Sequence, residues 1–450
     1  MGGRVQVSRT VIAFGSALGA ALMAVNALAA PVEITYYHRS DQTEADWAKA
    51  VIQRFNASHP DIVVKDLPSG TGGGSDYVEH LTALRASGES PDVFYGSTDK
   101  LGFIINGWAL DLSALINRDR SELALDQFFN GSWEPLTKGG KVYGVPLTLT
   151  PQLLYYNKDM FRASGLALLP TDWNDTTWTW DVFLADSKKL TQQKTDGGYK
   201  QLALTQATES NLPDVPWMFG GDFFPADAYK TSFADHSTFT RQENIDAYTA
   251  LQDYYARYAA AGPDKGIDAW SGFQNGQVAM DWIGAWKMNT YLVAAGSGGM
   301  KFAWGIAPTP LVLNRANTRW DDPLYVASDT KHVEAAWSFV KYATGPEGQA
   351  LWAEMTGKIP ARRTALDAYV QKTMQASGMT RAEVLSAVSG GLDHGRTSLE
   401  ESIAYAPAWI GDLTDKWMDP MLAGKMPVKE ALTNLQTIID GKLADALKKK

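Results

Sequence analysis

The chain has 450 residues, which is too long for one hydrophobic core at ~100 to 200 residues per domain, so we expect at least two domains. It contains no cysteine, which excludes a disulfide scaffold, thiolate metal sites and a cysteine nucleophile. The net charge is −9, and no dense run of lysine or arginine occurs before Lys448–Lys450, so we expect no nucleic-acid partner.

Residues 1–29 have the pattern of a secretory signal peptide. Arg4 and Arg9 precede an apolar run over 11–25, and Ala27-Leu28-Ala29 forms an A-x-A cleavage site. The alternative, a membrane anchor, needs ~20 apolar residues, more than this run provides. Removing the two arginines takes the net charge from −9 to −11, because the signal holds no acidic residue. With no cysteine to carry a lipid, we expect a free periplasmic protein of a bacterium with two membranes.

The first part of the mature chain alternates predicted strands and helices. Residues 32–37 (VEITYY) form a predicted strand, a polar loop follows, and Trp47, Val51 and Phe55 then recur every fourth residue, as in a helix that packs on a sheet. Further strands are expected over 62–64 and 92–95, with a helix over 76–86 between them. This alternation predicts an open, largely parallel sheet with helices on both faces.

In such sheets, ligands bind at the carboxyl ends of the strands. This rule selects the loops from His38 to Asp41 and from Gly96 to Asp99, which each follow a predicted strand. His38 could equally be a solvated loop histidine. Ser97, Thr98 and Asp99 could equally cap the helix expected to begin near Leu101.

The segment 141–161 (KVYGVPLTLTPQLLYYNKDMF) is an extended run whose short polar side chains alternate with apolar ones. Thr148, Thr150 and Gln152 fall on one edge, so the segment can bridge two domains and present hydroxyl and amide groups. A second domain is then expected, with a helix over 177–190 and a strand over 201–205. The polar, aromatic loop 206–221 follows that strand, and we expect it to face the same cleft.

The rest of the chain is predicted to hold a helix over 245–258, strands over 277–282 and 302–310, and helices over 333–343, 365–377 and 428–447. None of the common catalytic or phosphate-loop motifs occurs, and the six histidines are not clustered along the sequence. We therefore expect no catalytic site, no metal site and no cofactor.

Five motifs in chain order carry a resemblance to a known family. They are PDVFYGST at 91–98, GVPL and LLYYNKDMF within 144–161, TWTWDVFLADSKKLT at 177–191, GQVAMDWIGAW at 276–286 and GKIPAR at 357–362. Together they resemble the extracellular solute-binding proteins that serve ABC importers of sugars, the relatives of maltose-binding protein. The resemblance implies an α/β, type II periplasmic binding protein fold with two lobes, each an open mixed sheet flanked by helices, and several interdomain crossings.

The resemblance also implies where the chain passes between the lobes. It places a second crossing at Gly284–Trp286 and a third at Leu324–Ala327. The expected first lobe is then 30–145 plus 285–326, and the expected second lobe is 146–284 plus 327–450.

A sugar hydroxyl both donates and accepts a hydrogen bond, so a sugar site needs carboxylates, amides and hydroxyls beside aromatic rings that stack on the sugar. By position, the resemblance supports Ser97, Thr98, Thr150, Trp286, Arg362 and Trp409. The expected binding residues are His38, Arg39, Ser40, Ser97, Thr98, Asp99, Thr150, Gln152, Glu209, Trp217, Gly221, Asp222, Gly284, Trp286, Arg362 and Trp409.

In its first loop this sequence departs from the maltose-binding type. His38-Arg39-Ser40 stands where that type has an acidic residue and a lysine, so a maltodextrin ligand is in doubt. A histidine and an arginine would equally suit a ligand that carries a carboxylate, sulfonate or phosphate.

The expected function is a binding protein, not an enzyme, that closes over a carbohydrate and delivers it to the membrane permease of an ABC importer. The resemblance implies a monomer. One alternative is a periplasmic glycoside hydrolase or lyase, which for hydrolysis would need two carboxyl groups about 5 to 9.5 Å apart. Another is a scaffold or a partner of a membrane sensor kinase.

Overall fold

The computed structural model describes residues 1–3, 30–96, 99–204, 214–258, 266–404 and 414–448. Residues 4–29 of the expected signal sequence lie outside these ranges, as do the expected binding residues Ser97, Thr98, Glu209 and Trp409. Among the helices of the described ranges, none is long and apolar enough to cross a membrane.

In the described ranges the strands are β1 (Val32–His38), β2 (Ile62–Pro68), β3 (Val93–Tyr95), β4 (Thr137–Lys138), β5 (Lys141–Val142), β6 (Gly144–Asn157), β7 (Gln192–Gln193), β8 (Tyr199–Leu204), β9 (Val278–Gly284), β10 (Trp304–Ala307), β11 (Asn317–Val326) and β12 (Gly395–Thr397). One large mixed sheet has the order β2-β1-β3-β11-β6-β9-β8-β7, with β10 paired to β6 and β12 paired to β11. β1 is parallel to β2 and β3, and β8 is parallel to β9, as the alternation of elements predicts.

The helices fall in chain order between these strands. They are α1 (Gln42–Ser58), α2 (Gly74–Ser87), α3 (Lys100–Ile105), α4 (Ser113–Arg118), α5 (Arg120–Leu123), α6 (Lys158–Ala163), α7 (Trp180–Leu190), α8 (Asp214–Met218), α9 (Ala226–Thr231), α10 (Gln242–Tyr258), α11 (Met288–Gly296), α12 (Val333–Ala343), α13 (Pro346–Thr356), α14 (Asp367–Ser377), α15 (Arg381–Asp393), α16 (Leu399–Ser402), α18 (Asp419–Leu422) and α19 (Val428–Leu447).

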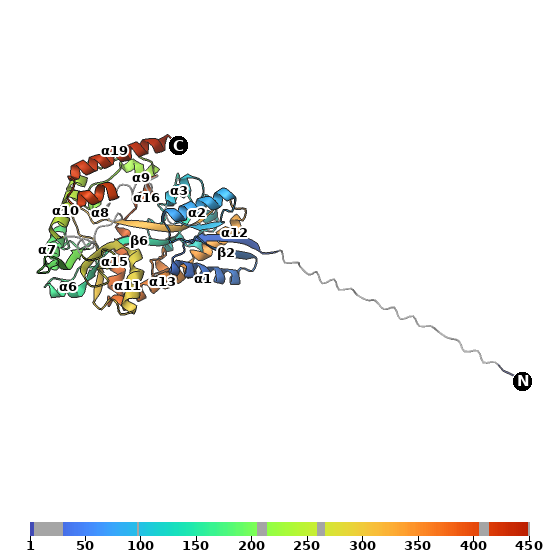
Figure 1. The fold of residues 1–450 in the computed structure, drawn as a ribbon. Helices are drawn as coiled ribbons and strands as arrows, with labels where there is room; N and C mark the ends of the chain where they lie inside the picture. The colour runs from blue at the N-terminus through green and yellow to red at the C-terminus, as the bar shows by residue number, and fades with distance from the viewer. Residues whose placement is uncertain (4–29, 97–98, 205–213, 259–265, 405–413, 449–450) are drawn as a thin grey trace.

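The molecule has two bodies joined through the middle of the sheet (Figure 1). We call the first lobe the body around β1, β2 and β3 with α1, α2, α3, α12 and α13, and the second lobe the body around β8 and β9 with α7, α10 and α19. In the first lobe Trp47 and Phe55 of α1 are buried with Trp352 of α13. In the second lobe Tyr254 of α10 is buried in one apolar cluster with Leu435 of α19.

Two long strands run from one lobe to the other. The first half of β6 pairs with β11, and its second half pairs with β9 and β10. β11 starts opposite Pro151 of β6 and ends opposite β3, in the first lobe. All fourteen residues of β6 are buried, because layers from both lobes cover it. The bridging role predicted for residues 141–161 is therefore seen in β6.

The later crossings differ from expectation. β9 ends at Gly284 while still paired with the second half of β6, and the chain then forms α11 and β10 on that same side. It returns to the first lobe along β11, so Leu324–Ala327 is the end of the second crossing and not a third one. Also, the expected boundary at residue 327 separates α12 and α13 from α1, against which they pack.

Candidate functional site

The two lobes meet beside the middle of β11. Its Trp320 lies opposite Thr150 of β6, and the Trp320 ring meets the Trp286 ring nearly edge to face, with centroids 5.0 Å apart. Both rings are half-buried. A Cβ at Gly284 would overlap the Trp286 ring, so glycine is required there for the ring to fold back over the end of β9. Three expected residues, Thr150, Gly284 and Trp286, are thus gathered around a fourth, Trp320, which the sequence analysis missed.

Carboxyl groups stand next to these rings. The Trp320 indole Nε1–H donates a hydrogen bond to Glu400 Oε1 of α16 over 2.6 Å. Asp99, just before α3, is close enough to Glu400 for the two charges to repel each other, and burial raises the pKa of Asp99 to about 6. Burial also raises the pKa of Glu400. The junction therefore offers the Glu400 carboxyl group bonded to an indole ring, and near it the Asp99 carboxyl group, which lies against Gly102 of α3.

Behind Asp99 and Glu400 lies a buried ion cluster. Lys100 Nζ contacts Asp322 Oδ1 at 2.5 Å and also pairs with Glu401. The Tyr95 hydroxyl donates to Asp322 over 2.7 Å. Burial alone would lower the pKa of Lys100, but Asp322 and Glu401 outweigh it and raise that pKa. For Glu401, burial raises the pKa, while the charge of Lys100 opposes the rise and favours the ionised pair.

On the second lobe, Asp222 collects three side-chain donors. Arg396 donates to Asp222 Oδ2 over 2.8 Å, the Trp217 indole donates to Oδ1 over 3.3 Å, and the Tyr229 hydroxyl also donates to Oδ1. The Arg396 guanidinium lies over the Trp217 ring at 4.2 Å, and Trp217 is 2% exposed. Trp217 is therefore not an open stacking surface in this arrangement, although the sequence analysis selected it as one.

The neighbouring Gly221 is held by packing. A Cβ at this position would overlap the amide of Asn244, a buried residue of α10. Gly221 is thus needed for the close approach of α10, and this accounts for the glycine without a ligand.

The expected residues of the first loop mostly hold one another. His38 is 2% exposed, with Nε2 2.6 Å from Asp66 Oδ1 and Nδ1 2.7 Å from the Arg39 carbonyl oxygen. Arg39 pairs with Asp41 at 2.6 Å and lies 3.6 Å from Glu44. The Ser40 hydroxyl oxygen accepts the Gly70 N–H over 2.8 Å. These bonds hold the loop after β1 against β2 and the loop that follows β2.

Two more expected residues are buried, Gln152 beside the end of β9 and Arg362 within the first lobe. Gln152 is fully buried in β6, where it lies opposite Gly284. Arg362 is 1% exposed and donates to the carbonyl oxygens of Thr344 and Leu123, at the ends of α12 and α5. Burial lowers the pKa of Arg362 to about 10. Its contacts are those of a cation that stabilises helix C-termini within the first lobe.

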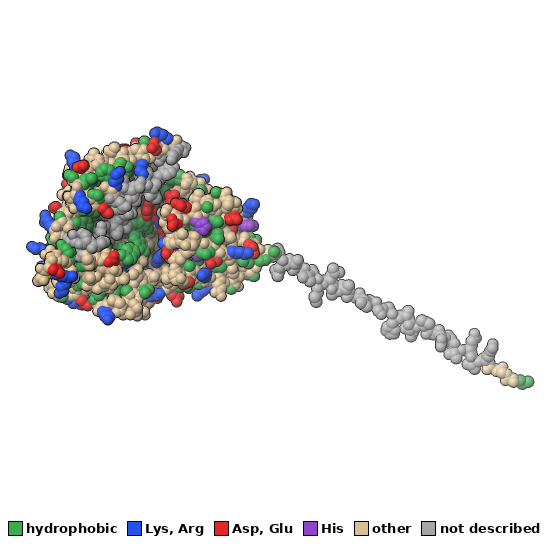
Figure 2. All heavy atoms as spheres, in the orientation of Figure 1, with side chains coloured by type: hydrophobic (Ala, Val, Ile, Leu, Met, Phe, Trp, Pro, Cys, Tyr) green, Lys and Arg blue, Asp and Glu red, His purple; other side chains and the backbone are tan. Residues whose placement is uncertain are grey.

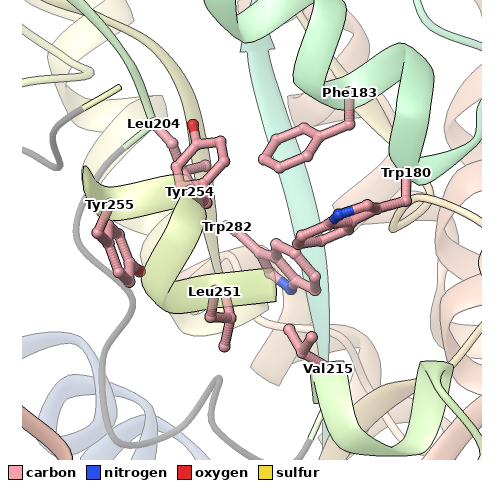
Figure 3. Close-up of a pocket in the computed structure, with 8 residues that line it drawn as sticks. All are labelled: Trp180, Phe183, Leu204, Val215, Leu251, Tyr254, Tyr255 and Trp282. Carbon is pink, nitrogen blue, oxygen red and sulfur yellow. The ribbon is translucent and has the colours of Figure 1, made fainter. Parts of the chain in front are cut away.

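A small apolar pocket lies inside the second lobe, between α7, α10 and the ends of β8 and β9 (Figure 3). Its lining consists of Trp180, Phe183, Leu204, Val215, Leu251, Tyr254, Tyr255 and Trp282. The Trp282 indole donates to buried Asp214 over 3.2 Å. With almost no polar lining, this pocket cannot satisfy sugar hydroxyls, so the junction near Trp286 and Trp320 is the better candidate.

Seen from outside, the surface is hollowed between the two lobes, and acidic and hydrophobic side chains gather in this hollow (Figure 2). Among the residues that the structure describes, no group of three or more His, Cys, Asp or Glu side chains is placed to hold a metal ion. Two lobes joined by shared strands, with aromatic and acidic groups where they meet, define a two-lobed solute-binding protein.

Comparisons with known proteins agree with this class. The family model of the bacterial extracellular solute-binding proteins matches residues 40–350. The chain therefore belongs to that family, and the resemblance seen in the five sequence motifs is confirmed.

Individual relatives are distant but span most of the chain. An uncharacterized lipoprotein of Streptomyces antibioticus is 27% identical over 352 residues, covering 75% of this chain and 74% of the relative. The diacetylchitobiose binding protein of Streptomyces coelicolor is 22% identical over 428 residues, covering 88% of this chain and 87% of the relative. An ABC substrate-binding protein from Listeria monocytogenes in complex with cycloalternan superposes with a TM-score of 0.73 at 22% identity, covering 92% and 99%. This last likeness confirms the predicted type II fold.

Proposed function

We propose that this chain is the carbohydrate receptor of an ABC importer. It captures a sugar between its lobes and delivers it, chemically unchanged, to the membrane permease. The observation that carries the proposal is the junction itself, where Trp286 and Trp320 stand beside Thr150 and the Glu400 carboxyl group. Indole rings stack on the apolar faces of sugars, and carboxylates and hydroxyls accept or donate hydrogen bonds to sugar hydroxyls. The names of several relatives, such as the diacetylchitobiose binding protein, support the same ligand class.

Capture works through the shared strands. β6 and β11 connect the lobes, so a change in their twist opens or closes the gap beside Trp320. A sugar that contacts both Asp99 of the first lobe and Trp286 after β9 binds the closed form more tightly than the open form. Binding therefore shifts the population toward the closed form, which is the form that docks on the permease.

The charges at the junction favour a neutral sugar over an acidic one. Arg39, which suggested an anionic ligand, already lies beside the carboxylates of Asp41 and Glu44. By contrast, Asp99 and Glu400 are close enough for their charges to repel each other, and Glu400 is bonded to the Trp320 indole. An anionic sugar would add a third negative charge there, which is unfavourable in a half-buried site.

We further propose that the mature protein is a monomer in the periplasm, released from its signal sequence and free of a lipid anchor. The family is extracellular, and this sequence has no cysteine to carry a lipid, although one relative is called a lipoprotein. The glycoside hydrolase alternative has no support among the comparisons, because the family and two of the three relatives named above, those from Streptomyces coelicolor and Listeria monocytogenes, are binding proteins.

A thermal-shift screen tests the function. The panel contains maltose, maltotriose, N,N′-diacetylchitobiose, arabino-oligosaccharides, glucosamine, glucuronic acid and a sugar phosphate, each followed by calorimetry. We expect a neutral mono- or oligosaccharide to raise the melting temperature most, since a ligand that binds only the folded state stabilises it. A panel in which no sugar raises it would contradict the proposal. Chromatography of the incubated sugars checks for turnover, and any product would reject a pure receptor.

A further inference from the structure

We propose that Lys100 is a positioning residue for ligand capture, whose ion pair with Glu401 ties the first lobe to α16 and favours the closed arrangement. This inference rests on the proposed function, because closure matters only if the protein captures a ligand between its lobes. Three features carry it: the two ends of the pair belong to different lobes, the pair is buried, and it adjoins the candidate sugar site.

Lys100 is fixed to the first lobe. It is the first residue of α3, whose Phe103 and Ile104 are buried with Phe94 of β3 and Tyr77 of α2. The Tyr325 hydroxyl donates to the Lys100 carbonyl oxygen over 3.3 Å. Any movement of the first lobe therefore carries the Lys100 side chain with it.

Glu401 is fixed to the second lobe. It lies in α16, and the following Ile403 is fully buried in the apolar cluster that contains α10 and α19. The Ala404 N–H donates to the carbonyl oxygen of Ser232, just after α9, over 2.8 Å. The Lys100–Glu401 pair is thus a contact between lobes, made by residues 301 positions apart in the chain.

The pair is buried where both lobes meet β11, whose Asp321 N–H also donates to the Glu401 carboxylate. The Lys100 side chain is 9% exposed and that of Glu401 is 2% exposed. Asp322 of β11 also pairs with Lys100, so the lysine keeps one counter-charge if Glu401 moves away. Opening the lobes would return both charges to water, which makes the pair reversible. While the lobes are closed, the attraction acts in a poorly hydrated site and opposes opening.

The same two short segments also supply the site. Asp99 precedes Lys100 in the chain, and Glu400 precedes Glu401. When Lys100 meets Glu401, Asp99 is brought close enough to Glu400 for their charges to repel each other, and Glu400 accepts the Trp320 indole N–H. The Lys100–Glu401 pair therefore sets the position of Asp99 and Glu400, the two carboxyl groups that face the ligand. This link makes Lys100 a positioning residue although it does not itself have to touch the sugar.

The chain supplies a matched control. Lys358 pairs with Glu44 in a similarly buried place, with side-chain exposures of 16% and 4%. Glu44 lies in α1, and Lys358 closely follows α13, which packs on α1. This second pair therefore lies wholly within the first lobe. Its loss should lower stability without changing the distance between the lobes.

The test measures closure in the absence of any sugar, so that it does not depend on identifying the ligand. Because the chain has no cysteine, the substitutions Glu89→Cys and Lys189→Cys place one spin label on each lobe. Electron–electron resonance then gives the distribution of distances between the labels for the wild type, Lys100→Met, Glu401→Gln, the double variant, Lys100→Arg and the control Glu44→Gln.

We expect Lys100→Met and Glu401→Gln each to lower the closed-to-open ratio about tenfold, a typical size for coupling between sites. The double variant should lower the closed-to-open ratio no further than the more severe single variant. Lys100→Arg should keep the ratio close to that of the wild type, and Glu44→Gln should leave it unchanged. If Lys100→Met does not fold, Glu401→Gln alone decides, because it keeps the side-chain shape and leaves Asp322 beside Lys100.

An unchanged ratio in Glu401→Gln, or an equal loss in Glu44→Gln, would overturn the proposal. The sugar screen separates this failure from a failure of the proposed function. If a sugar raises the melting temperature but the closed-to-open ratio is unchanged in the variants, only the role of the ion pair is rejected. If the variants change the ratio but no sugar raises the melting temperature, only the proposed function is rejected.

Discussion

The loop after β1 and the junction between α3 and α16 both carry several charged side chains, but these side chains have different partners in the two places. In the loop, His38 and Arg39 are bonded to Asp66, Asp41 and a neighbouring backbone carbonyl. At the junction, Glu400 is bonded to one of two half-buried indole rings, and Asp99 lies close enough for their charges to repel each other. The difference teaches that opposite charges pair with each other in the loop, whereas at the junction a carboxyl group lies beside a neutral indole N–H.

The largest effect should come from the indole pair. Trp286→Ala combined with Trp320→Ala should weaken the binding of the best sugar in the screen by at least thirtyfold, about 2 kcal/mol, because central aromatic side chains dominate binding energy. Calorimetry measures this loss, and the melting temperature reports on folding. Trp270→Ala is the control, since that ring is 57% exposed, contacts Lys287 rather than the indole pair, and should not change affinity. An unchanged dissociation constant in the double variant would remove both rings from the site.

The next effect should come from the acidic side of the junction. Glu400→Gln should weaken the same sugar about tenfold, since a hydrogen bond to a charged acceptor is worth about 1.5 to 3 kcal/mol. Calorimetry at one salt concentration measures it. The control is Glu430→Gln, which changes an exposed carboxylate on α19. Equal effects in the two variants would mean that Glu400 does not contact the ligand.

The loop after β1 should behave in the opposite way. His38→Ala should leave sugar affinity within about twofold, but should lower the free energy of unfolding by about 1 to 3 kcal/mol, because Asp66 loses a buried partner. Urea unfolding gives the stability, and the exposed His236→Ala is the control. Should His38→Ala or Arg39→Ala strongly reduce affinity instead, the loop belongs to the binding site and an anionic ligand deserves renewed testing.

The smallest effect concerns the pH dependence of stability. Burial raises the pKa of Asp99 to about 6, from 3.8 in the unfolded chain, so the folded protein holds a proton that the unfolded chain releases. Stability contributed by this proton is full below about pH 4 and is lost as the pH rises through 6. Asp99→Asn should therefore match the wild type at pH 4 and melt a few degrees higher at pH 8. If the difference in melting temperature between Asp99→Asn and the wild type is the same at pH 4 and pH 8, the pKa of Asp99 is not raised in the folded protein.

Much of the fold could be predicted from the sequence, because it follows from local patterns. The alternation of strands and helices predicted the parallel strands, and the alternating residues around Thr150 predicted the bridging strand β6. The later crossings could not be predicted in this way. Gly284 and Leu324 both lie near strand ends, and only the pairing of β9 and β11 with β6 shows which of these strands returns to the first lobe.

The site was only partly predictable for a related reason. Thr150 and Trp286 were selected from motifs, but Trp320 and Glu400 were not, because their importance comes from a contact between β11 and α16. The available signal for Trp320 was its place in an extended run, NTRWDDPLYV, that follows two predicted strands. For Glu400 no local pattern distinguishes it from a solvated acidic residue.

The position of α16 near the end of the chain has a consequence for biogenesis. Residues 399–402 complete the candidate site, although α3 and β11, which they contact, are synthesised much earlier. While the polypeptide is being synthesised and exported, a nascent chain that ends before α16 has both rings but not the carboxylate that bonds to Trp320. Such long-range contacts form slowly, so the receptor becomes able to hold its cargo only after α16 has emerged and packed against α3.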